Sequence, residues 1–270
     1  MIHHEAEVHE TAMVGPYSVI DEGVRVGAGC RIGPHCHLTG NMTIGEENDI
    51  HAGCVLGDAP QDLSYKNAQT FLVIGNRNRI REHVTIHRGT AEGSETRIGD
   101  HNFLMAHCHV GHNCLLGNHV ILANAVLLGG HVEIEDFAFV GGGAVVHQHC
   151  RIGTRSMIRG LSRISKDVAP YCMTVENNEL VGLNSVGLKR SDISLEHRSK
   201  LKAAYATLFH GGLNLSQGMK QLRENELIYE VNHLLDFIQK SKRGIGFPRK
   251  KPTDLGEQIE TSPLDEKRHF

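Results

Sequence analysis

The chain contains no tryptophan, and aromatic residues make up only 5% of its 270 positions. An ordinary globular core is therefore not expected, because such cores usually depend on bulky aromatic side chains. Glycine is abundant instead, with thirty residues. Since glycine permits tight corners and close backbone approach, this composition favours a fold of small, repeated layers.

Long apolar runs are also missing. No stretch approaches the roughly 20 apolar residues that a membrane helix needs, so membrane insertion is not expected. The N-terminal segment MIHHEAEVHE is charged and has no apolar centre, so it does not resemble a signal peptide and we expect a cytoplasmic protein. The formal net charge is -3, which argues against nucleic acid as a partner because phosphate binding requires a basic surface.

Closely spaced cysteine pairs are absent too. The seven cysteines stand singly, and no CxxC motif occurs. We therefore expect reduced thiols buried as small apolar residues rather than disulfides or a metal centre. Six of them fall inside the repeat described next: Cys30, Cys36, Cys54, Cys108, Cys114 and Cys150.

The main positive signal is an aliphatic residue at every sixth position. A period of six fits neither an amphipathic helix nor an alternating strand. It fits a short strand, a corner and another short strand, in which one aliphatic side chain points inward and glycine relaxes the corner. The positions are Val8, Val14, Ile20, Val26, Ile32, Leu38, Ile44, Ile50, Leu56, Ile74, Ile80, Ile86, Ile98, Leu104, Val110, Leu116, Leu122, Leu128, Ile134, Val140, Val146, Ile152, Ile158 and Ile164.

The interruptions of this period predict the domain organisation. Residues 57–73 and 87–97 are polar and out of phase, so they are expected to leave the β-helix as loops within residues 1–172. A connector follows over 173–191. A small helical cap over 192–245 is expected to begin at Ser194, to have a second helix capped by Ser216 and to end near Gly244, and a disordered tail is expected over 246–270.

The repeat resembles that of the hexapeptide-repeat transferases. The resemblance implies a mainly β chain folded as a left-handed, three-sided parallel β-helix with about 18 residues per coil, and about eight coils at the strand spacing of ~4.8 Å. Stacking by coils then puts His112, Gly130 and Gln148 in one column, with His131 in the next column. His147 lies beside them, and His109 lies three residues before His112.

This histidine cluster has three interpretations. Single histidines such as His35, His37 and His119 are best explained as exposed corner residues. The gathered set is also compatible with a zinc site, as in a zinc-dependent hydrolase or carbonic anhydrase, since imidazole is a common metal ligand. The third interpretation is general base catalysis by a neutral imidazole, with the N–H of Gly130 directed at a developing oxyanion.

A more selective resemblance is carried by longer motifs. AHCHVGHNC, GGAVVHQHC, APQDLSYK, IREHVTIHRGT and GLNSVGLKR are together similar to the UDP-N-acetylglucosamine O-acyltransferases, which begin lipid A synthesis. The resemblance implies direct transfer of an (R)-3-hydroxyacyl chain from acyl carrier protein to the 3-position of UDP-N-acetylglucosamine or its 3-amino analogue. It also implies a homotrimer without cofactor or metal. A sugar N-acyltransferase of the same fold remains the alternative.

The family's site residues can be carried over position by position. The resemblance makes His112 the general base and Gly130 the oxyanion donor. Gln61 and Asp62 would reach from a neighbouring subunit to hold the sugar, and Gly160 would set the acyl-chain length. The remaining residues implied in substrate binding are His109, His131, His147 and Gln148 around the sugar and thioester, and Asn184 and Arg190 at the nucleotide.

Some positions depart from the family's pattern. Ser64 replaces a usual lysine, and Asn113 replaces a common acid, so the orienting acceptor for His112 is expected to be another group, such as a backbone carbonyl. Val186 and Ser191 also depart in the connector. A basic surface near the last coils has two interpretations, ordinary solvated charge or a docking site for the acidic carrier protein: Arg151, Arg155, Arg159, Arg163, Lys166, Lys189 and Arg190.

Overall fold

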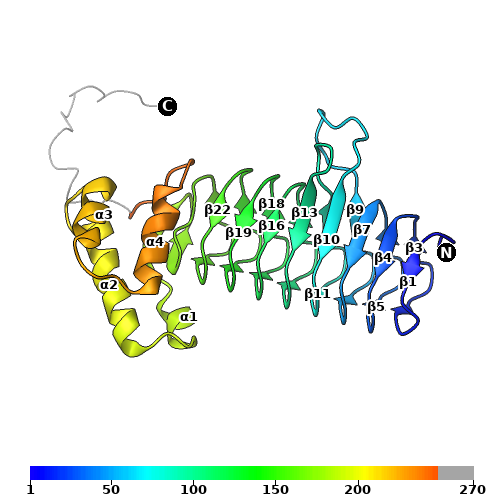
Figure 1. Ribbon diagram of the computed structural model, residues 1–270, viewed down its shortest axis with the longest axis horizontal. Helices are drawn as coiled ribbons and strands as arrows, with labels where there is room; N and C mark the ends of the chain where they lie inside the picture. The colour runs from blue at the N-terminus through cyan, green and yellow to red at the C-terminus, as the bar shows by residue number, and fades with distance from the viewer. Residues whose placement is uncertain (249–270) are drawn as a thin grey trace, which may run out of the picture.

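The computed structural model describes residues 1–248. Its first two thirds form a long three-sided prism of stacked coils, and helices cover one end (Figure 1). Each coil contributes one short strand to each of three sheets, and within the coils each strand pairs in parallel with strands of the neighbouring coils. The sixfold period therefore corresponds to one strand and one corner, as the sequence predicts.

The three sheets are named here by the order in which the chain enters them. Sheet 1 contains β1 (Glu7–Val8), β4 (Val24–Val26), β7 (Asn41–Ile44), β10 (Phe71–Ile74), β13 (Glu95–Ile98), β16 (Leu115–Leu116), β19 (Glu133–Ile134) and β22 (Arg151–Ile152). Sheet 2 contains β2 (Met13–Val14), β5 (Arg31–Ile32), β8 (Asp49–Ile50), β11 (Arg79–Ile80), β14 (Phe103–Leu104), β17 (Ile121–Leu122), β20 (Phe139–Val140), β23 (Met157–Ile158), β25 (Cys172–Val175) and β26 (Glu179–Leu183). Sheet 3 contains β3 (Val19–Ile20), β6 (His37–Leu38), β9 (Val55–Asp58), β12 (Thr85–His87), β15 (His109–Val110), β18 (Leu127–Leu128), β21 (Val145–Val146) and β24 (Arg163–Ile164).

Register between neighbouring strands shows where the two loops were inserted. Arg31 pairs with Asp49, 18 residues later, whereas Asp49 pairs with Arg79 and Arg79 with Phe103. The second and third steps are 30 and 24 residues, so the loops lengthen their coils by 12 and 6 residues. Their extent is narrower than expected from the sequence, because β9 and β10 leave only 59–70 outside the sheets and β12 and β13 leave 88–94. Short strand extensions at the loop bases account for the difference.

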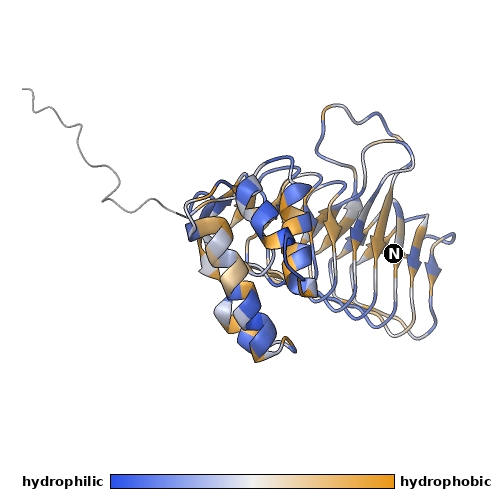
Figure 2. Cartoon of the chain, turned by 60° about the vertical axis from the view of Figure 1, so that its left-hand side comes forward, coloured by the Kyte–Doolittle hydropathy of each residue, from blue (hydrophilic) through white to orange (hydrophobic). Residues whose placement is uncertain are grey.

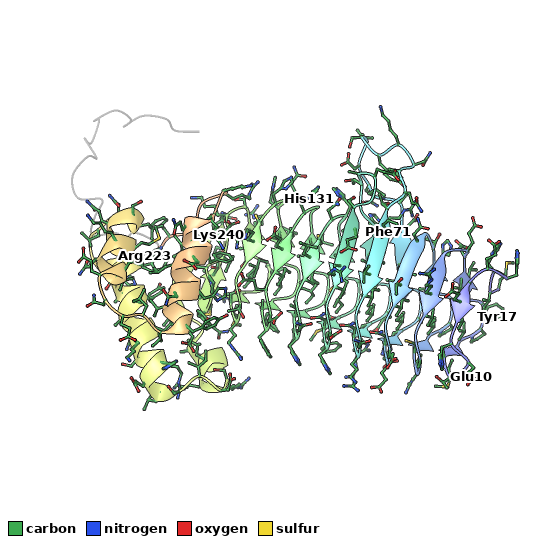
Figure 3. The ribbon with its side chains drawn as sticks, viewed as in Figure 1. Glu10, Tyr17, Phe71, His131, Arg223 and Lys240 are labelled. Atoms are coloured by element: carbon green, nitrogen blue, oxygen red, sulfur yellow. The ribbon has the colours of Figure 1, made fainter. Side chains whose placement is uncertain are left out.

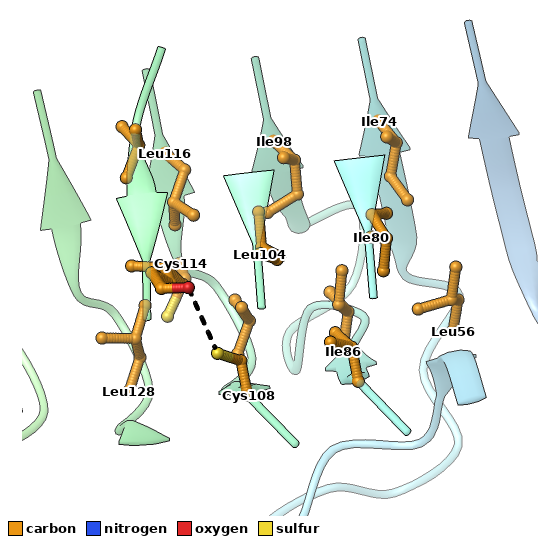
Figure 4. Packing of buried hydrophobic residues seen from close by; sticks show 14 of the residues in the cluster. Leu56, Ile74, Ile80, Ile86, Ile98, Leu104, Cys108, Cys114, Leu116 and Leu128 are labelled. Atoms are coloured by element: carbon orange, nitrogen blue, oxygen red, sulfur yellow. Dashed lines mark hydrogen bonds between the residues drawn. The ribbon is translucent and has the colours of Figure 1, made fainter. Parts of the chain in front are cut away.

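The aliphatic residues of the repeat fill the inside of the prism. Ile74, Ile98 and Leu116 stack along one wall, and all are almost fully buried (Figure 4). Burying one such side chain contributes about 1.5–3 kcal/mol, so the column is the main source of stability. All seven cysteines are unpaired and buried, which confirms their interpretation as small apolar residues.

The corners explain many of the histidines. His35, His83, His101, His107, His119, His131 and His149 all have positive φ, a backbone conformation in which histidine is more common than most residues. Coil stacking then brings corner rings together, as in the parallel pair His101–His119 at 4.9 Å. His35 and His119 are thus corner residues as predicted. His37 is not, because it lies on β6 and contacts Asp21 at 2.8 Å.

The cap has its own hydrophobic core, separate from that of the prism. After the hairpin β25–β26 come α1 (Ser185–Lys189), α2 (Leu195–His210), α3 (Leu215–Arg223) and α4 (Tyr229–Gln239), which show both apolar and polar faces (Figure 2). Ser194 caps α2 as predicted, but Ser216 does not cap α3. Asn214 does so in a reciprocal capping box with Gln217, because its side chain can reach the N–H three residues later.

The cap is held against the last coils by specific contacts. The Arg151 guanidinium lies 4.2 Å over the Phe237 ring, and His233 Nε2 lies 3.1 Å from Glu135. The predicted start of the tail at residue 246 is too early, because Phe247 still pairs with Glu179. Positions 249–270 lie outside the described residues. None of the helices within residues 1–248 is long and apolar enough to cross a membrane.

Candidate functional site

Both loops leave the prism at the edge that also carries His112. Segments 59–70 and 88–94 each follow a strand of sheet 3 and precede a strand of sheet 1, and so does the corner 111–114. Figure 3 shows His131 on the same edge as the loop that projects beside Phe71. We call this edge, where sheet 3 turns into sheet 1, the histidine edge. Loop residues therefore reach the histidines of the following coils within one chain.

His112 and Gly130 are packed directly against each other at this edge. A Cβ built on Gly130 would lie 2.5 Å from Nε2 and 3.0 Å from Nδ1 of His112, which is too close for any side chain. Glycine at position 130 therefore allows the His112 ring to occupy this place, and a larger residue would displace the ring. The Gly130 carbonyl accepts from the His149 N–H at 3.0 Å, while its own N–H has no acceptor among the described residues. That N–H remains available to a ligand beside Nε2.

Asn113 orients His112, which corrects the expectation of a backbone acceptor. His112 Nδ1 lies 2.9 Å from Asn113 Oδ1. The same oxygen accepts from the Thr90 main-chain N–H at 3.2 Å and from the Thr90 hydroxyl at 2.9 Å. Asn113 has a φ of 60°, which asparagine tolerates well, and its own N–H donates to Thr96 Oγ1 at 2.8 Å. The residue that departs from the family's pattern thus performs the orienting function itself.

Asp62 lies at the His112 of its own chain, whereas the sequence reasoning expected it to reach a neighbouring subunit. An Asp62 carboxylate oxygen is 3.9 Å from Nε2 of the His112 in the same chain. The loop can fold back because Asp62 Oδ1 accepts from both the N–H and the hydroxyl of Ser64, each at 2.8 Å. These hydrogen bonds, first that from the Ser64 N–H, hold the pKa of Asp62 below its usual value. Ser64 therefore stabilises this turn in place of the usual lysine.

His109 lies on sheet 3 beside two residues that the sequence reasoning did not select. Its Nδ1 is 2.7 Å from the Thr85 hydroxyl, and its ring packs edge-on to His87 at 4.9 Å. Burial lowers the pKa of His109 to about 4, with smaller contributions from His87 and His112. Burial likewise lowers the pKa of His87, so both imidazoles remain neutral near pH 7. His87 was identifiable only by its edge-on contact with His109, which the sequence does not show.

The remaining expected residues of this edge are more exposed. His131 packs edge-on to His112 at 5.2 Å and stacks on His149, and burial lowers its pKa. His147 and Gln148 are exposed one coil further on, with His147 Nδ1 3.1 Å from the Gln148 carbonyl. Gln61 is exposed on the 59–70 loop, next to Asp62. One chain thus gathers seven of the expected site residues around His112.

Three other expected residues lie on different edges. Asn184 caps α1 and donates to the Arg155 carbonyl at 2.9 Å, at the edge between sheets 1 and 2, and Arg190 is exposed at the end of α1. Gly160 follows β23 at the edge between sheets 2 and 3, where an added Cβ would meet the Gly142 carbonyl oxygen at 3.0 Å. A single chain does not bring these three residues to His112.

The gathered histidines do not converge on one point. Within residues 1–248, the one group of three ligand atoms all within 4.8 Å of one another is His3, Glu5 and Glu22, which lie on this edge but in the first coils, several coils before His112. Nδ1 of both His109 and His112 is already engaged by Thr85 and Asn113. The arrangement of one chain thus favours proton transfer at His112 over metal coordination.

A large groove lies elsewhere, between sheet 1 and the cap. It has a volume of about 1110 Å³ and is lined by Arg155, Tyr171, His197, Glu230 and His233 among others. Its charged groups are paired with one another, for example His197 with Glu230 at 3.0 Å. Nothing in it resembles the His112–Gly130 contact, so the histidine edge remains the candidate site for the chemistry.

Comparison with known proteins gives a consistent result. A bacterial transferase hexapeptide profile matches residues 5–40 and 95–130, and a profile described as UDP N-acetylglucosamine O-acyltransferase, domain 2, matches 167–246. The acyl-(acyl-carrier-protein)–UDP-N-acetylglucosamine O-acyltransferase of Syntrophobacter fumaroxidans is 44% identical over 249 residues, which covers 91% of this chain and 96% of that protein. The enzyme of the same name from Halorhodospira halophila is 45% identical over the same length and with the same coverage.

Solved structures show the same relationship in three dimensions. A crystal structure of a UDP-N-acetylglucosamine acyltransferase superposes with a TM-score of 0.89 at 36% identity, covering 93% of this chain and 97% of that one. The enzyme from Francisella novicida gives 0.84 at 33% identity, covering 98% and 100%. These likenesses, with the hexapeptide repeats, confirm that the prism is a left-handed β-helix.

Proposed function

The chain belongs to the family of acyl-(acyl-carrier-protein)–UDP-N-acetylglucosamine O-acyltransferases, and we propose that its histidine edge carries out the transfer with His112 as general base. It is an acyltransferase that acts on UDP-N-acetylglucosamine in the first step of lipid A biosynthesis. The observation that carries the proposal is the position of His112 Nε2, which lies directly against Gly130 while Asn113 holds Nδ1.

The proposed reaction is a direct transfer. The Nε2 lone pair of His112 takes the proton of the sugar 3-hydroxyl as that oxygen attacks the thioester carbonyl of an (R)-3-hydroxyacyl carrier protein. The Gly130 N–H donates to the oxyanion, and the glycine leaves room for it. When the C–S bond breaks, the thiolate recovers the proton from the imidazolium. The products are the acylated sugar nucleotide and the free carrier thiol.

Asp62 is proposed to bind the sugar and to stabilise charge. Its carboxylate, 3.9 Å from Nε2, can accept from a second sugar hydroxyl and also attract the imidazolium formed during the reaction. His109 remains neutral because burial lowers its pKa to about 4, so it donates or accepts a hydrogen bond without adding a competing positive charge. His131, His147, Gln148 and Gln61 are proposed to line the same sugar site.

A closed homotrimer would complete this site. In the later coils sheet 1 displays charged pairs such as Glu133–Arg151, whereas sheets 2 and 3 display apolar side chains there. The outward residues are Phe103, Ile121, Phe139 and Met157 on sheet 2, and Leu127 and Val145 on sheet 3. Packing sheet 3 of one subunit on sheet 2 of the next is a head-to-tail contact, which closes into a ring under threefold symmetry.

This packing supports the positions proposed for the remaining residues. The histidine edge of one subunit would face the sheet 1–sheet 2 edge of its neighbour, where Asn184 and Arg190 lie. They would then contact the nucleotide. Gly160, on the edge nearest the threefold axis, would border the acyl chain, and no cofactor or metal is required by this scheme.

The surface proposed for carrier protein docking is narrower than the sequence suggested. Arg151 and Arg155 are engaged internally, with Phe237 and with Asp192 respectively. The exposed cations that remain are Arg159, Arg163, Lys166, Lys189 and Arg190. A cytoplasmic location fits the unpaired buried cysteines, since disulfides are rare in that compartment.

The test combines product identity with one variant. The enzyme is incubated with a hydroxyacyl carrier protein and either UDP-N-acetylglucosamine or its 3-amino analogue, and the product is identified by mass. We expect acylation of the 3-hydroxyl, and exclusive use of the amine would identify an N-acyltransferase. His112→Ala should lower kcat by about 10²-fold or more without unfolding the protein. Normal turnover by the folded variant would exclude His112 as the base.

A further inference from the structure

We propose that the main-chain N–H of Thr90 is a tautomer lock for His112. Acting through the side-chain amide of Asn113, this N–H fixes which ring nitrogen of His112 carries the proton. Thr90 is thus a positioning residue contributed by the 88–94 loop. This inference rests on the proposed function of His112 as a base. Its starting point is that three donors or potential donors meet on one oxygen, Asn113 Oδ1, at 2.9, 3.2 and 2.9 Å.

The orientation of the Asn113 amide follows from the one partner that can only donate a hydrogen bond. The Thr90 hydroxyl can donate or accept, and a neutral imidazole nitrogen can also do either. The Thr90 main-chain N–H can only donate, so the atom facing it at 3.2 Å must be the amide oxygen. Asn113 Oδ1 can only accept, and His112 Nδ1 must therefore carry the proton. Nε2 is left with its lone pair free to accept a proton.

The alternative orientation would disable the base. If the amide rotated by half a turn, its NH₂ group would face both the Thr90 N–H and His112 Nδ1. Two donors would oppose each other at Thr90, and Nδ1 would have to accept. The proton would then lie on Nε2, where a general base needs its lone pair. The Thr90 N–H excludes this state because the donor–donor contact is unfavourable.

An aspartate at position 113 would not need this lock. Both oxygens of a carboxylate accept hydrogen bonds, so either orientation leaves the proton on Nδ1. The dependence on Thr90 is a consequence of having asparagine at position 113. It follows that removing the Thr90 N–H should matter for the asparagine enzyme and should matter little once position 113 is aspartate.

The experiment compares variants of the full chain. Thr90→Pro removes the N–H, Thr90→Val keeps it and removes only the hydroxyl, and each is made alone and with Asn113→Asp. We expect Thr90→Pro to lose about tenfold or more in kcat. The matched Thr90→Val control should retain kcat within about threefold. In the Asn113→Asp background, Thr90→Pro should lower kcat by less than about twofold.

A second readout is independent of turnover. The ¹⁵N chemical shifts of the His112 ring distinguish the two tautomers in the free protein. We expect Nδ1–H in the wild type and in Thr90→Val, and a substantial Nε2–H fraction in Thr90→Pro. If Thr90→Pro does not fold, the same N–H is removed by replacing the amide at residue 90 with an ester. An unchanged tautomer, or an equal loss of kcat in both backgrounds, would overturn the proposal. Full activity of His112→Ala would refute the proposed function while leaving the tautomer result valid.

Discussion

Replacing Gly130 with alanine tests the central contact of the site most directly. The added Cβ would lie 2.5 Å from His112 Nε2 and 3.0 Å from Nδ1, whereas non-bonded atoms settle at about 3.5–4.0 Å. The imidazole must therefore move by about 1 Å. A displacement of that size at a reacting group costs on the order of 10²-fold in rate. We expect kcat to fall by about that factor.

The substitution leaves the main-chain N–H of residue 130 in place, so the loss would report on the ring and not on the oxyanion donor. The free energy of unfolding should fall by only about 1–3 kcal/mol, because the His112 ring lies at an edge and can turn outward. The assay is steady-state acyl transfer together with thermal unfolding. Gly218→Ala is the control, since its Cβ would meet Leu208 at an ordinary 3.5 Å. A folded Gly130→Ala enzyme with more than half of the wild-type kcat would refute the proposed geometry.

Three further predictions follow from the positions of the residues. Mixed trimers of His112→Ala and Asp62→Ala subunits should remain inactive, because both residues serve the same site from one chain. Mixing His112→Ala with Asn184→Ala subunits should restore activity. Activity in the first mixture would indicate that the 59–70 loop crosses to a neighbouring subunit. Gly160→Met should shift preference from 14- toward 10-carbon hydroxyacyl donors, and an unchanged ratio would leave it a corner residue. Because the folded His109 has a pKa of about 4 while an unfolded histidine titrates near 6.5, the unfolded chain binds more protons between these values. Unfolding midpoints should therefore fall as pH drops from about 6.5 to 4, and His109→Gln should flatten that slope.

The fold could be predicted from the sequence because its period has a single cause. One strand plus one corner uses six residues, and each strand must put one aliphatic residue inside, so the pattern survives in residues such as Ile74, Ile98 and Leu116. The same spacing places His112 beside Gly130 before any coordinates are known. What the sequence predicted best is therefore what depends only on counting residues along regular coils.

The contacts made by the two loops could not be predicted in this way. Asp62 reaches His112 through a turn held by Ser64, and Thr90 reaches Asn113 through a tight bend at Gly89, where a Cβ would meet the Ser94 carbonyl at 2.5 Å. Such contacts depend on the φ and ψ angles of irregular residues. The cap of α3 shows the same limit, because two polar residues stood near its start and local geometry selected Asn214.

The regular coil also determines how this protein should unfold. Hydrogen-bonded partners such as Val8 and Val26 are only 18 residues apart, roughly 0.07 of the described chain, a sequence separation typical of fast-folding helical bundles. Each coil touches only its neighbours, so opening can begin at an end and stop at any coil boundary. His112 lies midway along the stack, several coils from either end. The neighbouring Gly111 amide, which donates to the Leu128 carbonyl at 3.0 Å, should therefore exchange with solvent far more slowly than the amides of the first coil. The site should thus persist when the ends of the prism unfold.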